Sequence, residues 1–267
     1  MKLATRSWPS SVVPAEPTVL LVHGITSSSR TWWRIAPALH GAGWQVLAVD
    51  LRCHGASGCE PLVGVRDAAH DVAETLDAEL GRIHVDVAWG HSLGGRTVLQ
   101  LLNDRPDAAN RAVIEDPPGR LTGLGERAAN WEREVELARS DPLAFAAEQR
   151  AANPAWDERD IGENVASVAA CRIGPVLGAL NAGLSETAIE LAPGIRVPTL
   201  LVVAERDSGL PEPDRSETIA ALPAGSQLVE LPGGHTLHRD VPDAYLRATL
   251  GWLSAPMTAP RPRDPSG

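Results

Sequence analysis

Ser92 lies in the pentapeptide Gly90-His91-Ser92-Leu93-Gly94, which has the pattern G-x-S-x-G. A serine hydroxyl is a weak nucleophile at neutral pH, so it needs a base and a backbone that presents its oxygen. The residues 83–89 before the pentapeptide have a strand-like pattern, and residues 96–103 after it have a helix-like pattern. A strand, a sharp turn and a helix in this order present the serine on a strained turn, and the glycines allow close approach of the backbone. The pattern therefore predicts that Ser92 is a nucleophile.

A nucleophilic serine needs a histidine that accepts its proton. His235 follows the last strand-like run, residues 227–231, and comes directly after two glycines. These glycines give the turn the freedom to bring the imidazole to Ser92. We therefore predict that His235 is the base, although a role in capping the following helix is the alternative for this residue.

Two other histidines lie near these motifs. His238 is three residues beyond His235 and is the competing candidate for the base. His91 is next to Ser92, but a sharp turn directs adjacent side chains away from each other. We expect His91 to support packing.

An acid must orient the histidine. Asp207 follows the strand-like run 199–203 and is our first choice. Asp116 follows the run 112–114 and is the alternative acid, because an acid that reaches the histidine from either strand end satisfies the geometry. The competing interpretation of Asp116 is a turn residue at a strand end before two prolines.

The developing oxyanion needs hydrogen-bond donors, which we expect to be backbone N–H groups. One is predicted from Leu93, directly after the nucleophile. The other is predicted from Ile25, in the loop after the buried run 19–22, where Gly24 permits close backbone approach.

Short apolar runs alternate with longer amphipathic ones, which is typical of a parallel sheet covered by helices. Nearly every predicted strand is followed by polar residues at its C-terminal end, where open α/β sheets bind ligands. Helical spacing predicts a helix over 64–81. Six strands are predicted, at residues 19–22, 45–49, 85–89, 112–114, 199–203 and 227–231.

Residues 117–194 break this alternation, because they contain helical patterns and no strand-like run. A structureless loop of that length is improbable, so we predict an inserted helical cap. Residues 1–116 and 195–253 then form the core, and the proline-rich tail 254–267 is predicted to be disordered. The cap helices are predicted at residues 126–139, 142–152, 158–170 and 175–181.

The 267 residues carry a net charge of −10, which argues against nucleic acid or an anionic membrane as the main partner. No apolar run approaches the length of a membrane span, and the first eleven residues lack the features of a signal peptide. The three cysteines are odd in number and lack the spacing of metal ligands. We therefore expect a reduced chain in the cytoplasm.

The sequence resembles the lid-bearing esterases and lactonases of the α/β-hydrolase family. The resemblance extends from about residue 3 to residue 253, apart from the cap, and it depends on four motifs and their order. They are the oxyanion segment 22–24, the elbow 90–95, the acid loop 205–207 and the histidine loop 234–238. One departure is Cys53, which stands where the family's loop motif has its first glycine, and a short N-terminal segment predicts a sheet without a full first hairpin.

The resemblance implies a hydrolase that cleaves a carboxylic ester or lactone through an acyl-enzyme, with no metal and no other cofactor. The same residues would also serve carbon–carbon bond hydrolysis, thioester hydrolysis or cofactor-free perhydrolysis. A non-catalytic ligand-binding protein is the third alternative. The motifs leave the oligomeric state open.

Tryptophan is frequent in this chain, with eight residues against one phenylalanine and one tyrosine. Trp32 and Trp33 follow the predicted oxyanion loop, whereas Trp131 and Trp156 belong to the predicted cap. A pocket with such walls suits a small-molecule substrate with an apolar or aromatic acyl group. For each tryptophan the alternative is a packing role.

Overall fold

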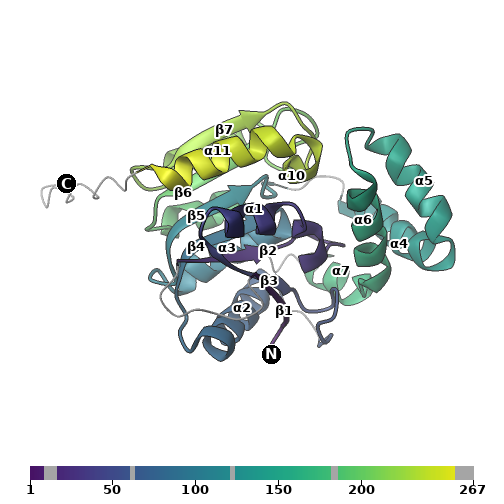
Figure 1. Ribbon diagram of the computed structural model, residues 1–267, viewed down its shortest axis with the longest axis horizontal. Coiled ribbons are helices and arrows are strands. Elements are labelled where there is room, and N and C mark those ends of the chain that lie inside the picture. The colour runs from purple at the N-terminus through teal and green to yellow at the C-terminus, as the bar shows by residue number, and fades with distance from the viewer. Residues whose placement is uncertain (9–16, 61–63, 121–123, 182–185, 256–267) are drawn as a thin grey trace, which may run out of the picture.

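The structure is a computed structural model that describes residues 1–8, 17–60, 64–120, 124–181 and 186–255. A seven-stranded sheet forms its centre, with the strand order β1-β3-β2-β4-β5-β6-β7. β1 is antiparallel to β3, and all other neighbouring strands are parallel. The predicted α/β-hydrolase architecture, a mostly parallel sheet flanked by helices, is confirmed (Figure 1). The predicted tail lies outside the described residues from residue 256 onward.

Six strands coincide with the predicted runs, because each is a short run rich in aliphatic residues. Five of them are buried along most of their length, whereas the edge strand β7 is largely exposed. The seventh, β1, was not predicted; it is a partly exposed edge strand whose polar residues give no apolar run. The strands are β1 (Ala4–Trp8), β2 (Thr18–Val22), β3 (Gln45–Asp50), β4 (Val85–His91), β5 (Ala109–Glu115), β6 (Thr199–Ala204) and β7 (Gln227–Leu231).

The sheet register places the ends of β4 and β5 side by side. His91 pairs with Glu115, so the residue after β4, Ser92, and the residue after β5, Asp116, leave adjacent strands at the same edge. On the other side of β4, Val22 pairs with Gly90, which brings the loop after β2 to this edge as well. The parallel register thus gathers the elbow, the oxyanion segment and the alternative acid at one edge of the sheet.

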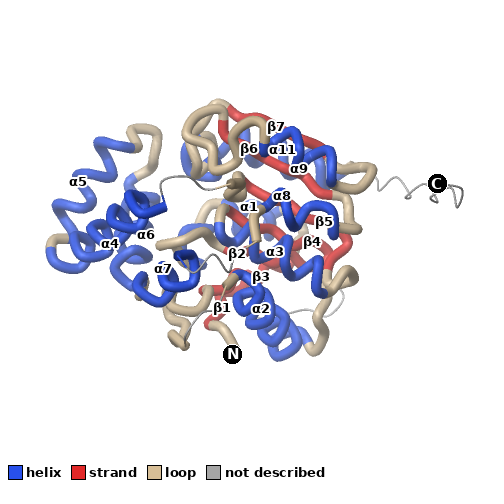
Figure 2. The backbone as a smooth tube through the Cα atoms, turned by 180° about the vertical axis from the view of Figure 1, so that it is seen from behind, coloured by secondary structure: helices blue, strands red, loops and turns tan. Residues whose placement is uncertain are grey.

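Two layers of helices cover the sheet (Figures 1 and 2). Apolar clusters fill the space on each face. The helix predicted over 64–81 is confirmed as α2, which ends at Gly81 in a left-handed conformation. One face carries α1 (Ile35–Gly41) and α11 (Pro242–Ser254), and the other carries α2 (Val65–Leu80), α3 (Leu93–Asp104), α8 (Ala188–Leu191) and α9 (Asp214–Ala221). Short helices η1 (Ser29–Trp32), η2 (Ala192–Gly194) and α10 (Leu237–Asp240) lie in the connections.

Four helices between β5 and β6 lie beside the sheet rather than on its faces, as both views show (Figures 1 and 2). They agree closely with the predicted helices, and two begin at aspartate caps, Asp141 and Asp157. We keep the name cap for residues 117–194, and the division into core and cap stays a prediction. The four helices are α4 (Leu124–Ser140), α5 (Pro142–Ala152), α6 (Glu158–Ala170) and α7 (Ile173–Asn181).

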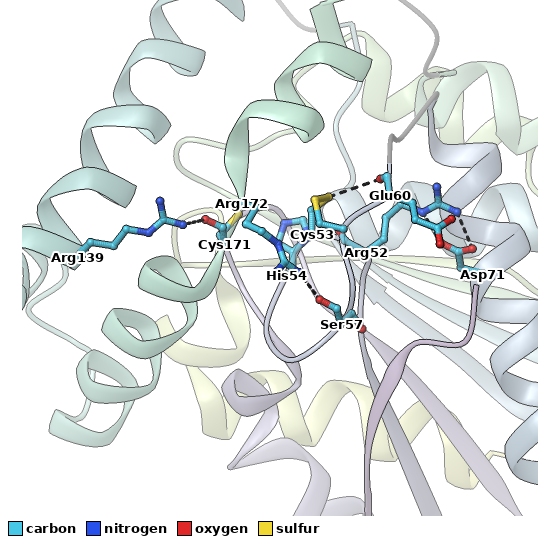
Figure 3. The surroundings of a disulfide bond; sticks show 10 residues. Arg52, Cys53, His54, Ser57, Glu60, Asp71, Arg139, Cys171 and Arg172 are labelled. Carbon is cyan, nitrogen blue, oxygen red and sulfur yellow. Dashed lines mark hydrogen bonds and ion pairs between the residues drawn. A yellow bond between two sulfur atoms is a disulfide. The ribbon is translucent and has the colours of Figure 1, made fainter.

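The expectation of a reduced chain is wrong, because Cys53 and Cys59 form a disulfide and only Cys171 is a free thiol (Figure 3). Cys53 has φ +66°, a region that favours glycine, at the position where the family's loop motif has glycine. The disulfide removes the basis on which a cytoplasmic location is predicted. Separately, no described helix is both long enough and apolar enough to cross a membrane.

The disulfide loop also contacts the cap. The backbone N–H of Arg172 donates to the carbonyl of Cys53 at 2.8 Å, and its guanidinium donates to the carbonyl of Ser57 (Figure 3). Beside the loop, Arg52 makes a buried two-point ion pair with Asp71 of α2. The loop after β3 is therefore fixed on both sides.

Candidate active site

Ser92 occupies a sharp turn between β4 and α3, with φ +54° and ψ −118°. Its backbone N–H donates to the carbonyl of Glu115 at 2.9 Å, so the neighbouring strand holds the turn in place. The flanking glycines are required by contact: a Cβ at Gly90 would lie 2.3 Å from the carbonyl oxygen of Gly94, and one at Gly94 would lie 2.2 Å from that of Val22. The predicted turn geometry is therefore present.

His235 connects Ser92 to a carboxylate. Its Nε2 lies 2.9 Å from Ser92 Oγ, and its Nδ1 lies 2.5 Å from Asp116 Oδ2. Because a carboxylate only accepts, Nδ1 carries the proton, and Nε2 is left to accept from the serine hydroxyl. Residues from the ends of β4, β5 and β7 thus form one hydrogen-bonded chain. Within it, the contact of His235 with Ser92 is the one predicted from the glycine-flanked turn before His235.

Asp116 is completely buried and is held by the loop after β6. Oδ1 accepts from the hydroxyl of Ser208 at 2.6 Å and from the N–H of Ala204 at 3.1 Å, while Oδ2 also accepts from the N–H of Gly209 at 2.7 Å. Burial by itself would raise the pKa of Asp116, but the hydrogen bond and charge of His235, with those of Ser208 and Gly209, outweigh it and lower the pKa. The carboxylate is therefore ionised and acts as an acceptor for His235.

The prediction that Asp207 is the acid is wrong, because its side chain is exposed and makes no described hydrogen bond to His235. The reason lies in the loop after β6. This loop turns toward Asp116 and contributes donors, Ser208 and Gly209, instead of a carboxylate. Asp116, the alternative acid, is the residue that binds His235. The competing interpretation, in which Asp116 is only a turn residue, is therefore wrong.

The competing histidine, His238, is buried away from Ser92 and binds Glu115. Its Nδ1 lies 2.9 Å from both carboxylate oxygens of Glu115, which also accepts from the hydroxyl of Tyr245 at 2.8 Å. Burial raises the pKa of Glu115 and lowers that of His238. Glu115, which lies directly before the acid, is a buried polar residue that the sequence pattern did not single out.

His91 supports the loop that carries His235 by packing and by one hydrogen bond. Its Nε2 donates to the carbonyl of His235 at 2.9 Å, and the two rings lie 5.0 Å apart between centroids. Burial lowers the pKa of His91 to about 3, so the ring is neutral at physiological pH. This agrees with the supporting role expected from the sequence.

Ile25 and Leu93, the predicted oxyanion donors, both line the cavity that contains Ser92. Neither backbone N–H has an acceptor among the described hydrogen bonds. His23 fixes the loop before Ile25, since its Nδ1 donates to the carbonyl of Gly24 at 2.7 Å and its Nε2 accepts from the N–H of Leu51 at 2.9 Å. A role in stabilising an oxyanion stays a prediction.

The cavity has a volume of about 220 Å³ and lies between the sheet edge and the cap. Trp131 of α4 and Trp156, before α6, form part of its wall, as predicted. The expectation that Trp32 and Trp33 line the pocket is wrong. Trp32 is fully buried against His238, and the indole N–H of Trp33 donates to Asp160 at 2.8 Å, outside the cavity.

A group of possible metal ligands among the described residues lies away from this cavity, on α2. It consists of His70, Asp71 and Glu74, but the buried Asp71 already binds Arg52 and the N-terminal ammonium group. None of the three lines the cavity beside Ser92. We therefore assign no metal ion to this group.

Comparisons with known proteins identify the family and the fold of the chain. The N-formylmaleamate deformylase of Pseudomonas putida is 26% identical over 252 residues, which cover 90% of this chain and 89% of that protein. The sn-1-specific diacylglycerol lipase ABHD11 of Mus musculus is 34% identical over 110 residues, but these are 40% of this chain and only 35% of the lipase. The enol-lactonase from Burkholderia xenovorans LB400 has the same fold, with a TM-score of 0.73 at 22% identity, covering 95% of this chain and 96% of the other.

Residues 19–248 match the alpha/beta hydrolase family, a span that contains β2 from residue 19, the strands β3 to β7 and the cap. The mostly parallel sheet and the serine turn are those that the resemblance to that family implies. The chain belongs to the alpha/beta hydrolase family.

Proposed function

We propose that the protein is a serine hydrolase that cleaves a carboxylic ester or lactone with Ser92 as nucleophile, His235 as base and Asp116 as the orienting acid. The observation that carries the proposal is the unbroken chain of two hydrogen bonds from Ser92 through His235 to Asp116, at the wall of a cavity. A nucleophile, a base and an orienting group within hydrogen-bond reach are the arrangement that activates a hydroxyl.

In the first half-reaction, Ser92 Oγ attacks the carbonyl carbon while His235 Nε2 takes its proton. Asp116 stabilises the imidazolium that forms, and its buried position keeps the ring oriented. His235 then gives the proton to the leaving alcohol, and an acyl-enzyme remains on Ser92. In the second half-reaction His235 takes a proton from water, the resulting hydroxide cleaves the acyl-enzyme, and the proton returns to Ser92.

The negative charge on the carbonyl oxygen needs donors at both tetrahedral stages. The N–H groups of Ile25 and Leu93 serve as these donors in the proposed reaction, because both residues line the cavity and lack described acceptors. A donor of this kind contributes about 3 kcal/mol of transition-state stabilisation.

The cavity favours a small substrate. Its volume of about 220 Å³ is below the roughly 300–1,000 Å³ of drug-sized ligand sites. Trp131, Trp156 and Leu180 supply apolar contact area for the acyl part, which supports the predicted apolar or aromatic acyl group. The names of the relatives, a lipase and a deformylase, also fit acyl transfer to water.

A panel of short 4-nitrophenyl esters, lactones and thioesters tests this proposal on the wild type and on Ser92→Ala. We expect ester or lactone turnover by the wild type, and a loss of about 10⁴-fold or more in kcat for the variant. Turnover that persists in Ser92→Ala would contradict the role of the serine. A folded wild type that turns over no ester or lactone would contradict the proposed reaction.

A further inference from the structure

The charged side chains that line the cavity beside Ser92 are positive, whereas the whole chain carries a net negative charge. Three arginines line it, namely Arg96, Arg127 and Arg239, and no aspartate or glutamate is among its described lining residues. The chain as a whole carries a net charge of −10, with 34 acidic residues against 24 lysines and arginines. A cavity lined by one sign of charge concentrates ligands of the other sign.

Arg239 is the arginine of this set that is most deeply built into the structure. It belongs to α10, four residues after His235, and is only 4% exposed. Its Nη1 donates to Asn164 Oδ1 at 3.0 Å, and its guanidinium lies 4.6 Å from the ring centre of Trp156. A core residue thus meets two cap residues at the cavity wall.

The guanidinium of Arg239 has no ion-pair partner among the described residues. Its Nε is buried and donates to no described acceptor, and Nη1 is its one nitrogen with a described hydrogen bond. Burial lowers the pKa of Arg239 to about 10, which still leaves it protonated at physiological pH. A buried cation without a paired anion is costly.

Three carboxylates act on Arg239 through their charge, but each of them is hydrogen-bonded to other donors. Asp160 accepts from Trp33 and Arg34, and Asp240 accepts from the indole N–H of Trp156 and the backbone N–H of Gly234. Glu115 is bound by His238 and Tyr245. The protein therefore holds a charged guanidinium at the wall of the cavity and directs its nearby carboxylates to other donors.

We propose that Arg239, held in place by its hydrogen bond to Asn164, forms an anion subsite and that the substrate is a small ester or lactone with a free carboxylate. A planar guanidinium offers a carboxylate two parallel donors, and the adjacent face of Trp156 restricts the plane in which it binds. The carboxylate supplies the missing counter-charge, and its binding joins the histidine loop to the cap. This inference rests on the proposed function and names its substrate class.

The test uses two competitors of equal length that differ in charge: methyl hydrogen glutarate and methyl 4-carbamoylbutanoate, in which a primary amide replaces the carboxylate. Each competes with 4-nitrophenyl acetate, and competition reports binding whether or not the competitor is cleaved. For the wild type we expect the inhibition constant of the carboxylate to be lower by about 10- to 100-fold. Similar inhibition constants for the two competitors would overturn the subsite.

Arg239→Gln should bring the ratio of the two inhibition constants close to one, and Arg239→Lys should retain part of the preference. The ratio is measured within one preparation, so a fraction of unfolded protein does not change it. The matched control is Arg133→Gln, which removes an arginine that pairs with Glu148 on the cap surface. This control should keep the wild-type ratio. If Arg239→Gln keeps the wild-type ratio of inhibition constants, the assignment of Arg239 is wrong.

The two proposals fail in different ways. If 4-nitrophenyl acetate is cleaved through Ser92 but charge makes no difference to competition, the hydrolase proposal stands and the subsite is wrong. If no ester is cleaved, the hydrolase proposal is wrong, and calorimetric titration of the wild type with the same two compounds decides about the subsite. If Arg239→Gln does not fold, the subsite is tested by the ratio of inhibition constants for the wild type and by the same ratio for Arg239→Lys.

Discussion

The Nδ1 atom of His235 lies 2.5 Å from the Oδ2 atom of Asp116, although 119 positions separate these residues in the chain. The contact is possible because β5 lies next to β4 in the sheet, so that Asp116 leaves its strand beside the serine turn. The loop after β6 then closes over the carboxylate with Ser208 and Gly209. The identity of the acid is therefore a property of the sheet order and of this loop.

Asp116→Asn should lower kcat by about 10⁴-fold, because an amide that donates to Nδ1 selects the wrong tautomer of His235. The measurement is kcat on the best ester found, with circular dichroism as the check that the variant is folded. Asp207→Asn is the matched control, since Asp207 is exposed and forms no described bond to His235. Loss of activity in the control with retention in Asp116→Asn would reverse the assignment.

Gly24→Ala should impair the reaction, because the added Cβ would lie 2.8 Å from His91 Nδ1 and 3.1 Å from Ser92 Cβ. We expect kcat/KM to fall by about 100-fold, as for misplacement of catalytic groups by about 1 Å. Gly41→Ala provides the comparison, since a Cβ there meets nothing within 4 Å. Equal activity of both variants would show that the loop after β2 does not need this close approach.

The stability of the protein should decrease on acidification partly because His54 is buried in its neutral form. Burial, followed by the charge of His23, lowers the pKa of His54 to about 3. The unfolded chain binds a proton there below about pH 6.5 and the folded chain does not, so unfolding becomes easier as the pH falls from about 6.5 to about 3.

Urea unfolding at several pH values checks this effect with His54→Gln. The slope of the free energy of unfolding between about pH 6 and pH 4 should decrease by about 1.4 kcal/mol per pH unit relative to the wild type. The slope is compared, not the absolute stability, because the substitution itself perturbs a buried site. An unchanged slope would mean that His54 is protonated in the folded protein.

The disulfide predicts a simple thiol count. Denatured protein should show one reactive thiol per chain, from Cys171, without reductant and three after reduction. Cys59→Ser should lower the free energy of unfolding by about 2 kcal/mol, since the bond closes a short loop. Three thiols before reduction would show that the bond is absent.

The serine and the histidine of the site could be predicted from the sequence because their signals are local. Ser92 lies between glycines that the turn requires, and His235 follows two glycines after a strand run. The acid has no such signal. Asp116 and Asp207 both follow strands, and only the path of the loop after β6 distinguishes them.

The buried charges and the pocket walls were also harder to predict, because they depend on contacts between segments that are far apart in the chain. Nothing in the local pattern around Glu115 or Arg239 indicates that these charged side chains are buried, because burial depends on partners far along the chain. Trp32 and Trp33 follow the oxyanion loop in sequence, but η1 directs Trp32 into the core. Six of the seven strands and the cap helices were predictable because the hydrophobic pattern reports them directly, whereas the polar edge strand β1 was not.

Intact-mass measurement after treatment with a fluorophosphonate tests the activation of Ser92 by His235 most directly. We expect one adduct per chain, located on Ser92 by peptide mapping, absent from Ser92→Ala and formed at least about 10³-fold more slowly in His235→Ala. An unlabelled wild type, an adduct on another residue, or labelling of His235→Ala at the wild-type rate would contradict this activation.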